Sequence, residues 1–247
     1  MLKRQYENIF KNQDNHWWYK GMRAINESLL KKYLPENKPL KILDAGCGPG
    51  AALVYLSKFG DVVGVDISDD ALKFAKKRGK VVKGDVSDLP FKDETFDVVV
   101  CLDVLYHKWV DLKKALSELK RVLKPGGVLL IREPAFDWFK SSEDIASATK
   151  HRFTKNEVKG EFDNSFVIKK ITYVNFFLFP FALIKRIPEV VGFKKKRGVS
   201  DVQAASPFLN KILLFIFQKE QSLINYVNFP FGTSVICVAQ KKYDKKN

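Results

Sequence analysis

Three glycines follow an acidic residue in the stretch LDAGCGPGAAL, and their spacing suggests a ligand bound by the backbone. Gly46, Gly48 and Gly50 have no side chains, so a ligand can approach the main chain and the start of the following helix. Asp66 lies 22 residues after Asp44, where an acidic group commonly accepts hydrogen bonds from ribose hydroxyls. We therefore expect a nucleoside-containing cofactor. GCGPGA also fits the dinucleotide pattern G-x-G-x-x-G/A, so the loop alone does not exclude a nicotinamide cofactor.

Strand and helix signals alternate around these residues. The runs LKILDA, DVVGVD, VVKGD, FDVVVCLD and GVLLIREP are of strand type, and amphipathic segments lie between most of them. Ser68 is expected to cap a helix that carries Asp69 and Asp70 in its first turn and is followed by Gly79. Such alternation indicates right-handed βαβ crossovers and a mostly parallel sheet with helices on both faces. Ligands of this architecture bind beyond the carboxyl ends of the strands.

The composition is that of a globular protein. The 247 residues are 46% hydrophobic, which is ample for a core. Cys47, Cys101 and Cys237 are far apart without a CxxC pair, so we expect neither a disulfide framework nor a metal site. The first residues lack a signal-peptide pattern, and a cytoplasmic location is expected. The net charge of +15 favours anionic partners such as nucleic acid, a phospholipid surface or a phosphorylated substrate.

Five sequence blocks over residues 42–131 resemble the class I S-adenosylmethionine-dependent methyltransferases, particularly the type 11 group. They are ILDAGCGPG, VVGVDIS, VVKGDVSDLPF, FDVVVCLDVLYH and ELKRVLKPGGVLLI. The acidic residue two positions before the first glycine and the LKPGG turn are atypical of dehydrogenases. The resemblance implies an α/β class with a Rossmann-like, doubly wound, mostly parallel sheet of seven strands. Its sixth and seventh strands would form an antiparallel hairpin, with an apolar helical insertion between them over about 174–230.

The resemblance also implies roles for particular residues near the start of the sheet. Asp44 and the backbone of Gly46 and Gly48 would surround the methionine part of S-adenosylmethionine. Asp66 would hold the ribose, and the adjacent Ile67 belongs to the same predicted site.

Further cofactor contacts are implied elsewhere in the chain. Asp85 would lie by the adenine amino group, Val86 would offer its backbone amide to the ring, and Leu102 would line the pocket. Asp85 has an alternative role as the cap of a turn. In the N-terminal segment, Tyr19 and Arg23 are placed to reach the cofactor's carboxylate, Arg23 by a bidentate contact. Core packing is the alternative for the aromatic residues there.

Methyl transfer is an in-line displacement at the methyl carbon of a sulfonium, so the protein mainly aligns the nucleophile and excludes water. His107, in VLYHKW, is the first candidate for a base because it follows the fourth strand and an imidazole titrates near neutrality. A structural hydrogen bond is its alternative role. His151, in KHRFTKNE, is the second candidate, although Thr154 and Glu157 form a capping-box pattern typical of an ordinary helix start.

The second half of the chain differs from the first. Residues 138–247 hold 19 Lys and Arg against 9 Asp and Glu, and 18 aromatic residues. Their longest apolar run is broken by Pro180 and Pro188 and is too short to span a bilayer. Ser206 and Pro207 predict the start of a second apolar helix.

Two interpretations of this insertion stay open. In one, residues 174–217 form a lid for an apolar or lipid-linked acceptor and contact anionic headgroups at a membrane surface, with the basic residues 194–197 taking part. In the other, the phenylalanines pack against the sheet or a second subunit in a homodimer, and the basic residues are a solvated loop.

The sequence therefore predicts a single methyltransferase domain over 1–247. Residues 1–35 would form a helical cap, 36–137 the cofactor-binding core and 138–247 the half that selects the substrate. We expect methyl transfer from S-adenosylmethionine to a small or lipid-linked acceptor, at oxygen, by a cytoplasmic or membrane-peripheral enzyme. An RNA methyltransferase is the alternative enzyme, although no RNA-binding module supports it. A cofactor-binding partner subunit without catalysis is the alternative from another class.

Overall fold

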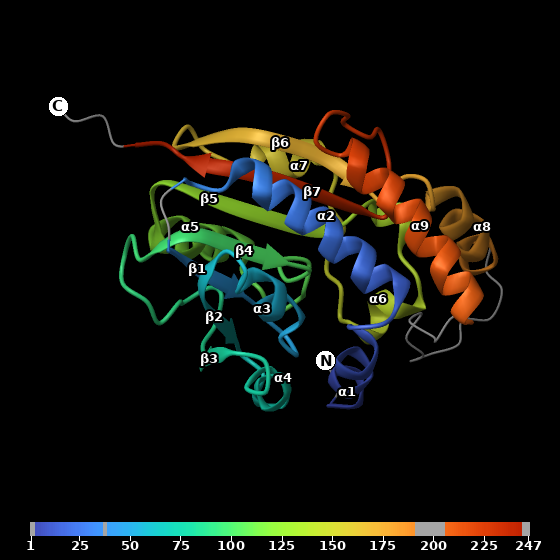
Figure 1. The fold of residues 1–247 in the computed structure, drawn as a ribbon, viewed down its shortest axis with the longest axis horizontal. Coiled ribbons are helices and arrows are strands. Elements are labelled where there is room, and N and C mark those ends of the chain that lie inside the picture. The colour runs from blue at the N-terminus through green and yellow to red at the C-terminus, as the bar shows by residue number, and fades with distance from the viewer. Residues whose placement is uncertain (1–2, 37–38, 191–205, 244–247) are drawn as a thin grey trace.

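The centre of the computed structural model, which describes residues 3–36, 39–190 and 206–243, is a seven-stranded sheet (Figure 1). The strand order is β3-β2-β1-β4-β5-β7-β6. The first five strands run parallel, and β7 is antiparallel to both of its neighbours. The strands are β1 (Leu40–Ala45), β2 (Gly60–Asp66), β3 (Lys80–Lys83), β4 (Phe96–Leu102), β5 (Leu123–Pro134), β6 (Phe166–Val174) and β7 (Ser234–Lys241). The predicted α/β class, doubly wound sheet and terminal antiparallel hairpin are confirmed.

Helices cover both faces of the sheet (Figure 1). One face packs against α2, α3 and α9, and the other packs against α5 and α7. The helices are α1 (Lys3–Asn12), α2 (Trp17–Tyr33), α3 (Ala51–Leu56), α4 (Asp69–Ala75), α5 (Leu112–Val122), α6 (Ser142–Ala146), α7 (Lys155–Gly160), α8 (Phe179–Val190) and α9 (Pro207–Leu223), with a short 3-10 helix η1 (Asp137–Phe139).

The central strand β4 shows why the two faces form. Its side chains alternate between the faces, as the pleat requires. Val98 and Val100 belong to the core on the side of α2 and α3, whereas Val99 and Cys101 belong to the core on the side of α5. All four are fully buried, so an apolar run without polar alternation specifies a strand covered on both sides.

Side-chain caps fix three helix starts that the sequence predicted. The Ser68 hydroxyl accepts a hydrogen bond from the Ala71 amide at the start of α4. Thr154 and Glu157 form the capping box of α7. Ser206 caps α9, with Pro207 as its first residue.

The N-terminal helix α1 and the segment that follows it pack on α4 and the residues just after it. The ring centroids of Phe10 in α1 and Phe74 in α4 are 5.0 Å apart. Between α1 and α2, Asp14 accepts two hydrogen bonds from Arg78, at 2.9 and 2.6 Å. The segment before the sheet is therefore docked on a helix of the core.

The helices α8 and α9 form the insertion predicted between the last two strands. The insertion leaves β6 at Val174 and returns to β7 at Ser234, and these two residues are paired in the sheet. The Trp17 amide at the start of α2 donates to the Asn210 side chain of α9 at 2.7 Å. The basic residues 194–197 lie outside the described residues. Within the described part of the chain, every helix is too short or too polar to cross a membrane.

Candidate functional site

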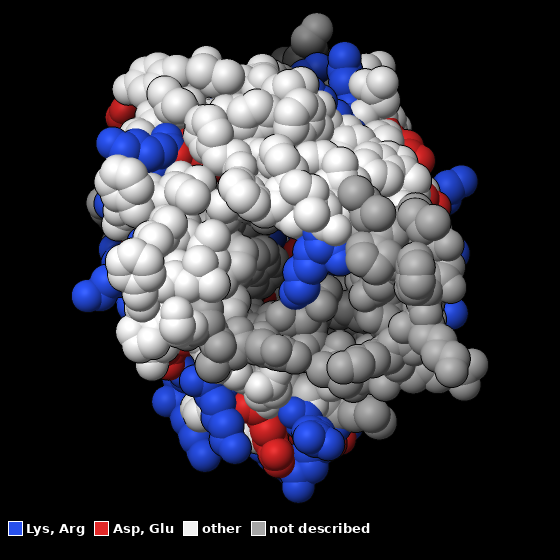
Figure 2. All heavy atoms as spheres, turned by 90° about the vertical axis from the view of Figure 1, so that its right-hand side faces the viewer, with Lys and Arg blue, Asp and Glu red and all other residues white. Residues whose placement is uncertain are grey.

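A cavity of about 620 Å³ lies at the carboxyl ends of the parallel strands. The glycine loop after β1 and the ends of β2 and β4 line it on one side, and residues of α1 and α2 line another. Residues of α8 and α9 complete the wall. Figure 2 looks onto the side of the molecule that carries α8 and α9 and shows a hollow there, with basic side chains beside it. The topology therefore brings the predicted cofactor loop and the apolar insertion to one cavity.

The glycine loop turns sharply because its glycines adopt backbone angles that other residues avoid. Gly46 has a φ of 77°, and its amide donates to the Val65 carbonyl at 2.8 Å. A β-carbon on Gly46 would lie 2.3 Å from the Val104 side chain, so this glycine is required by packing. A β-carbon on Gly48 would meet nothing within 4 Å. Gly48 therefore presents its backbone to the cavity, as contact with a ligand requires.

Asp44 is the most deeply buried acidic group of the cavity wall, and only 2% of its surface is exposed. Its Oδ2 atom has no hydrogen-bond partner among the described residues. Burial, together with the nearby carboxylate of Asp66, raises the pKa of Asp44 to about 7, while Arg132 lowers it. A buried acidic oxygen without a partner is suited to bind a cationic or hydrogen-bond-donating ligand group.

Asp66 holds the glycine loop in place from the end of β2. Its Oδ2 accepts a hydrogen bond from the Gly48 amide at 2.8 Å, and its Oδ1 accepts one from the Ser68 amide at 2.8 Å. Burial raises the pKa of Asp66, and these two amides oppose the rise. Because each carboxylate oxygen can accept more than one hydrogen bond, Asp66 can still receive a ribose hydroxyl.

The residues predicted near the adenine lie on the same cavity wall. Asp85, Val86 and Leu102 all line the cavity, as does the exposed Ile67. The Oδ1 atom of Asp85 accepts a hydrogen bond from the Ser87 amide at 2.8 Å. Asp85 therefore caps a turn, which was its alternative role, and lines the cavity as well.

Tyr19 and Arg23 line the cavity from α2. The Nε atom of Arg23 is 3.9 Å from Glu27, and 38% of the Arg23 side chain is exposed. All ten predicted cofactor residues thus line one cavity, although they come from separate parts of the chain: Tyr19, Arg23, Asp44, Gly46, Gly48, Asp66, Ile67, Asp85, Val86 and Leu102.

His107 also lines this cavity. Its Nδ1 atom lies 2.8 Å from the carbonyl oxygen of Ser147, so Nδ1 carries the proton and donates it there. The ring stacks on Trp109, with centroids 4.3 Å apart. Burial lowers the pKa of His107 to about 4. The imidazole is therefore neutral at physiological pH, with Nε2 as its acceptor atom.

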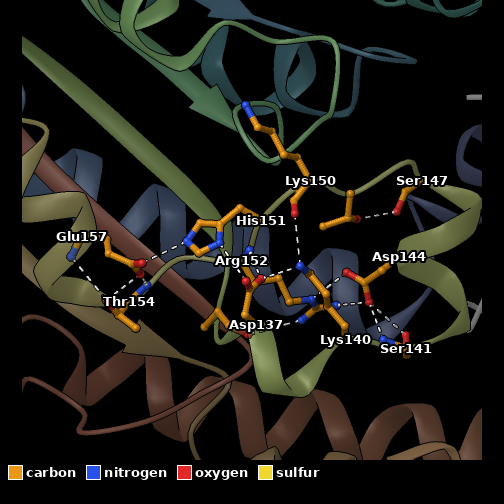
Figure 3. A network of polar contacts seen from close by, with 12 residues as sticks. Asp137, Lys140, Ser141, Asp144, Ser147, Lys150, His151, Arg152, Thr154 and Glu157 are labelled. Atoms are coloured by element: carbon orange, nitrogen blue, oxygen red, sulfur yellow. Dashed lines mark hydrogen bonds and ion pairs between the residues drawn. The ribbon is translucent and has the colours of Figure 1, made fainter.

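His151 does not lie among the residues that line the cavity. Its Nδ1 is 2.9 Å from Asp137, and its Nε2 is 3.1 Å from Glu157 (Figure 3). The neighbouring Arg152 pairs with Asp144 at 2.7 Å. His151 thus bridges η1 and α7, and we do not carry its predicted catalytic role into the proposal below.

Sequence reasoning missed a charged cluster at the ends of β4 and β5. Arg132 is buried, pairs with Asp103, and lies 5.6 Å from the centroid of the Trp18 ring. Glu133 accepts hydrogen bonds from the backbone amides of residues 104–106, the segment that leads into His107. The charged pair at the end of the apolar run GVLLIREP was the available signal, because charges in a buried strand need partners.

The side of the cavity away from the glycine loop combines large apolar residues with polar and charged ones. Phe181 contributes from α8 and Leu213 from α9, and Trp109 lies on the wall near His107. Lys185 and Arg186 of α8 also line the cavity. This wall fits an acceptor with a substantial apolar part.

The model of the family described as "Methyltransferase domain" matches residues 43–131. A demethylmenaquinone methyltransferase of Staphylococcus aureus is 33% identical over 144 residues, which cover 53% of this chain and 59% of the relative. A phthiotriol/phenolphthiotriol dimycocerosates methyltransferase of Mycobacterium ulcerans is 29% identical over 131 residues, covering 49% and 48%. The chain spans about half the length of the curated relatives it matches.

The fold extends beyond the matched sequence. In the solved complex of the Haloferax volcanii Trm112 methyltransferase activator and a putative methyltransferase, the similar chain has a TM-score of 0.60 and 19% identity. The match covers 99% of this chain and 96% of that one. At this identity the likeness concerns the fold alone.

Proposed function

We propose that this chain, a member of the class I S-adenosylmethionine-dependent methyltransferases, transfers the methyl group of that cofactor to oxygen in a small or lipid-linked acceptor with an apolar part. The observation that carries the proposal is a single cavity. It joins the glycine loop and Asp44 to the apolar wall that Phe181 of α8 and Leu213 of α9 provide.

The residues of the cavity fit S-adenosylmethionine. The unpartnered Oδ2 of Asp44 can accept a hydrogen bond from the cofactor's ammonium group, and the open space at Gly48 admits its methionine part. Asp66 would take the ribose, and Asp85 with Val86 would flank the adenine. When bound, the cofactor supplies an electrophilic methyl group on a good leaving group.

The chain itself would bind the acceptor, exclude water and accept the proton that the acceptor hydroxyl loses. We infer that the neutral His107 accepts a hydrogen bond from the acceptor hydroxyl through Nε2, while the carbonyl of Ser147 fixes the ring through Nδ1. The low pKa of His107 makes it a weak base. A weak base suffices, because a hydroxyl becomes strongly acidic as its oxygen forms a third bond.

Two relatives support the acceptor class. The names of the Staphylococcus and Mycobacterium relatives give demethylmenaquinone and the phthiotriol and phenolphthiotriol dimycocerosates as their acceptors. An acceptor with a long apolar part is consistent with the aromatic wall near Trp109 and Phe181. That the accepting atom is an oxygen is also part of the proposal. We infer it from the presence of His107 in the same cavity.

Calorimetric titration tests the cofactor part of the proposal. S-adenosylmethionine and its demethylated product should bind, and NAD should not. Asp66→Lys should weaken binding at least about tenfold, because a hydrogen bond to a charged group contributes roughly 1.5–3 kcal/mol. Asp61→Lys is the matched control, since Asp61 is exposed in the same strand. Equal cofactor affinity in both variants would show that Asp66 does not contribute to binding the cofactor.

A transfer assay tests the acceptor class. Labelled cofactor is incubated with the protein and with cell extract fractionated into lipid, small-molecule and RNA pools. We expect label in the lipid or small-molecule pool, and loss of that label with the Asp66 variant. Label that appears only in RNA would overturn the proposed acceptor while leaving the cofactor assignment intact.

A further inference from the structure

We propose that the outer face of α8 and α9 docks on an anionic lipid surface, from which the cavity receives its acceptor. We call this the docking face and define it by five apolar residues and two lysines: Phe181, Ile184, Phe208, Ile212, Phe215, Lys211 and Lys219. The delivery of an acceptor rests on the proposed function, whereas the docking itself does not require methyl transfer.

The helix α9 is apolar on two opposite sides, although only one side packs on the protein. Phe217 and Ile224 are buried in the core shared with α2. Phe208, Ile212 and Phe215 follow the spacing of one helical face, and their exposed fractions are 75%, 42% and 56%. One apolar stripe suffices to hold a surface helix, so the second stripe serves another contact.

The helix α8, which lies at the same end of the molecule as α9, also exposes apolar residues (Figure 1). Phe181 and Ile184 of α8 are 66% and 65% exposed. Phe181 also lines the cavity, as does Leu213 of α9. Among the described residues of this side of the molecule, uncharged side chains lie along part of the rim of the hollow and basic side chains stand beside its opening (Figure 2). The docking face thus adjoins the cavity through Phe181, which belongs to both.

The positive charges of the docking face favour an anionic surface as its partner. Lys211 and Lys219 of α9 are exposed, whereas Glu220, the acidic residue within α9, is buried and accepts the backbone amides of residues 175–177. The Lys219 ammonium lies 4.9 Å from the centroid of the Phe215 ring. Its alkyl chain thus runs along the apolar stripe and its charge stands beside it, as at a membrane interface.

Net charge argues against a second copy of this chain as the occupant. Self-association through the docking face would bring two chains of net charge +15 together, with exposed lysines on both. Anionic headgroups instead attract these lysines, and the attraction adds to the burial of the aromatic residues.

Vesicle co-sedimentation tests the docking directly. The full chain is mixed with vesicles of phosphatidylcholine alone or with phosphatidylserine, without methyl donor or acceptor. We expect binding to the anionic vesicles and much weaker binding to the neutral ones. The combined change Phe208→Ser, Ile212→Ser and Phe215→Ser should lower the affinity at least about tenfold, because three exposed apolar side chains no longer insert.

Two further variants separate docking from a general loss of apolar surface. Val54→Ser, Val82→Ser and Val167→Ser together remove three exposed apolar side chains from other elements and should leave binding unchanged. Lys211→Gln with Lys219→Gln should reduce binding and its dependence on salt. Absence of vesicle binding, equal loss in both apolar triples, or a stable dimer that only the α9 triple dissociates would overturn the proposal. Calorimetric cofactor binding is measured on every variant, so failure to dock is distinguishable from failure of the proposed function.

Discussion

Phe217 of α9 lies directly over Gly21 of α2. A β-carbon on Gly21 would stand 2.3 Å from the Phe217 ring, a distance that real side chains do not reach. Phe217 is 1% exposed, and its centroid is 5.7 Å from that of Trp17. The absence of a side chain at one position of α2 thus allows α9 to pack closely, and α9 carries part of the cavity wall.

Gly21→Ala should destabilise the protein. The new methyl group forces the Phe217 ring to move, which costs about 1–3 kcal/mol, and the better helix propensity of alanine offsets up to about 1 kcal/mol of this. Gly160→Ala is the control, because a β-carbon there meets open space at the end of α7. Chemical denaturation of both variants measures the difference in the free energy of unfolding. A Gly21→Ala variant as stable as the control would show that α9 does not need this close contact.

His107→Asn should reduce the rate of methyl transfer about a hundredfold, toward the low end for a general base, because a weak base gains little from proton transfer. At saturating cofactor, the wild-type rate should stay constant as the pH falls from 7 to about 5 and decline near pH 4, because the neutral imidazole is the active form and its pKa is about 4. His151→Asn should leave the rate unchanged. A decline centred near pH 6.5 would contradict the lowered pKa of His107, and an unchanged rate in His107→Asn would place His107 outside the reaction.

Cofactor binding near neutral pH should release a fraction of a proton from Asp44. The pKa of this carboxyl group is raised to about 7 in the protein, so the group is partly protonated at that pH. A cationic ligand favours the ionised form and lowers the pKa, and affinity should therefore rise with pH up to about 8. Titrations in buffers with different ionisation enthalpies measure the release. Asp44→Asn should abolish the release and weaken binding; an unchanged release in this variant would assign the proton to another group.

Phe181→Ser should raise the KM for the acceptor by roughly three- to tenfold and leave the affinity for S-adenosylmethionine unchanged, because Phe181 lies on the apolar wall of the cavity. Ile184→Ser, on the same helix and equally exposed, does not change that wall. The comparison is made in solution without vesicles, so that docking does not contribute. Equal KM values for the two variants would place the acceptor elsewhere.

The succession of strands and helices along the first half of the chain and the position of the glycine loop could be predicted from the sequence, because both depend on local signals. Apolar runs end at Asp44, Asp66 and Leu102, and parallel strands bring such ends to one edge of the sheet. The helix starts at Ser68 and Ser206 were predictable for the same reason, since a cap needs only its own neighbours.

The sequence could not predict contacts that depend on packing between distant elements. The pairing of Asp103 with Arg132 requires that β4 and β5 lie side by side in one register. His151 follows a basic residue and precedes a helix, a pattern that says nothing about the direction of its ring. The apolar character of α9 was predicted from the sequence, but only the contact of Phe217 with α2 shows which side of the helix is inside.

The pairing of Val174 with Ser234 has a consequence for how the segment between β6 and β7 can change in sequence and length. The excursion that carries α8 and α9 departs and returns at adjacent sheet positions, so its length and sequence can vary without changing the sheet, provided that a helix still packs on α2 in the place of α9. The apolar wall that Phe181 and Leu213 provide can therefore be exchanged. Chimeras that keep β1 to β7 and replace only this excursion should still bind the cofactor and should prefer a different acceptor.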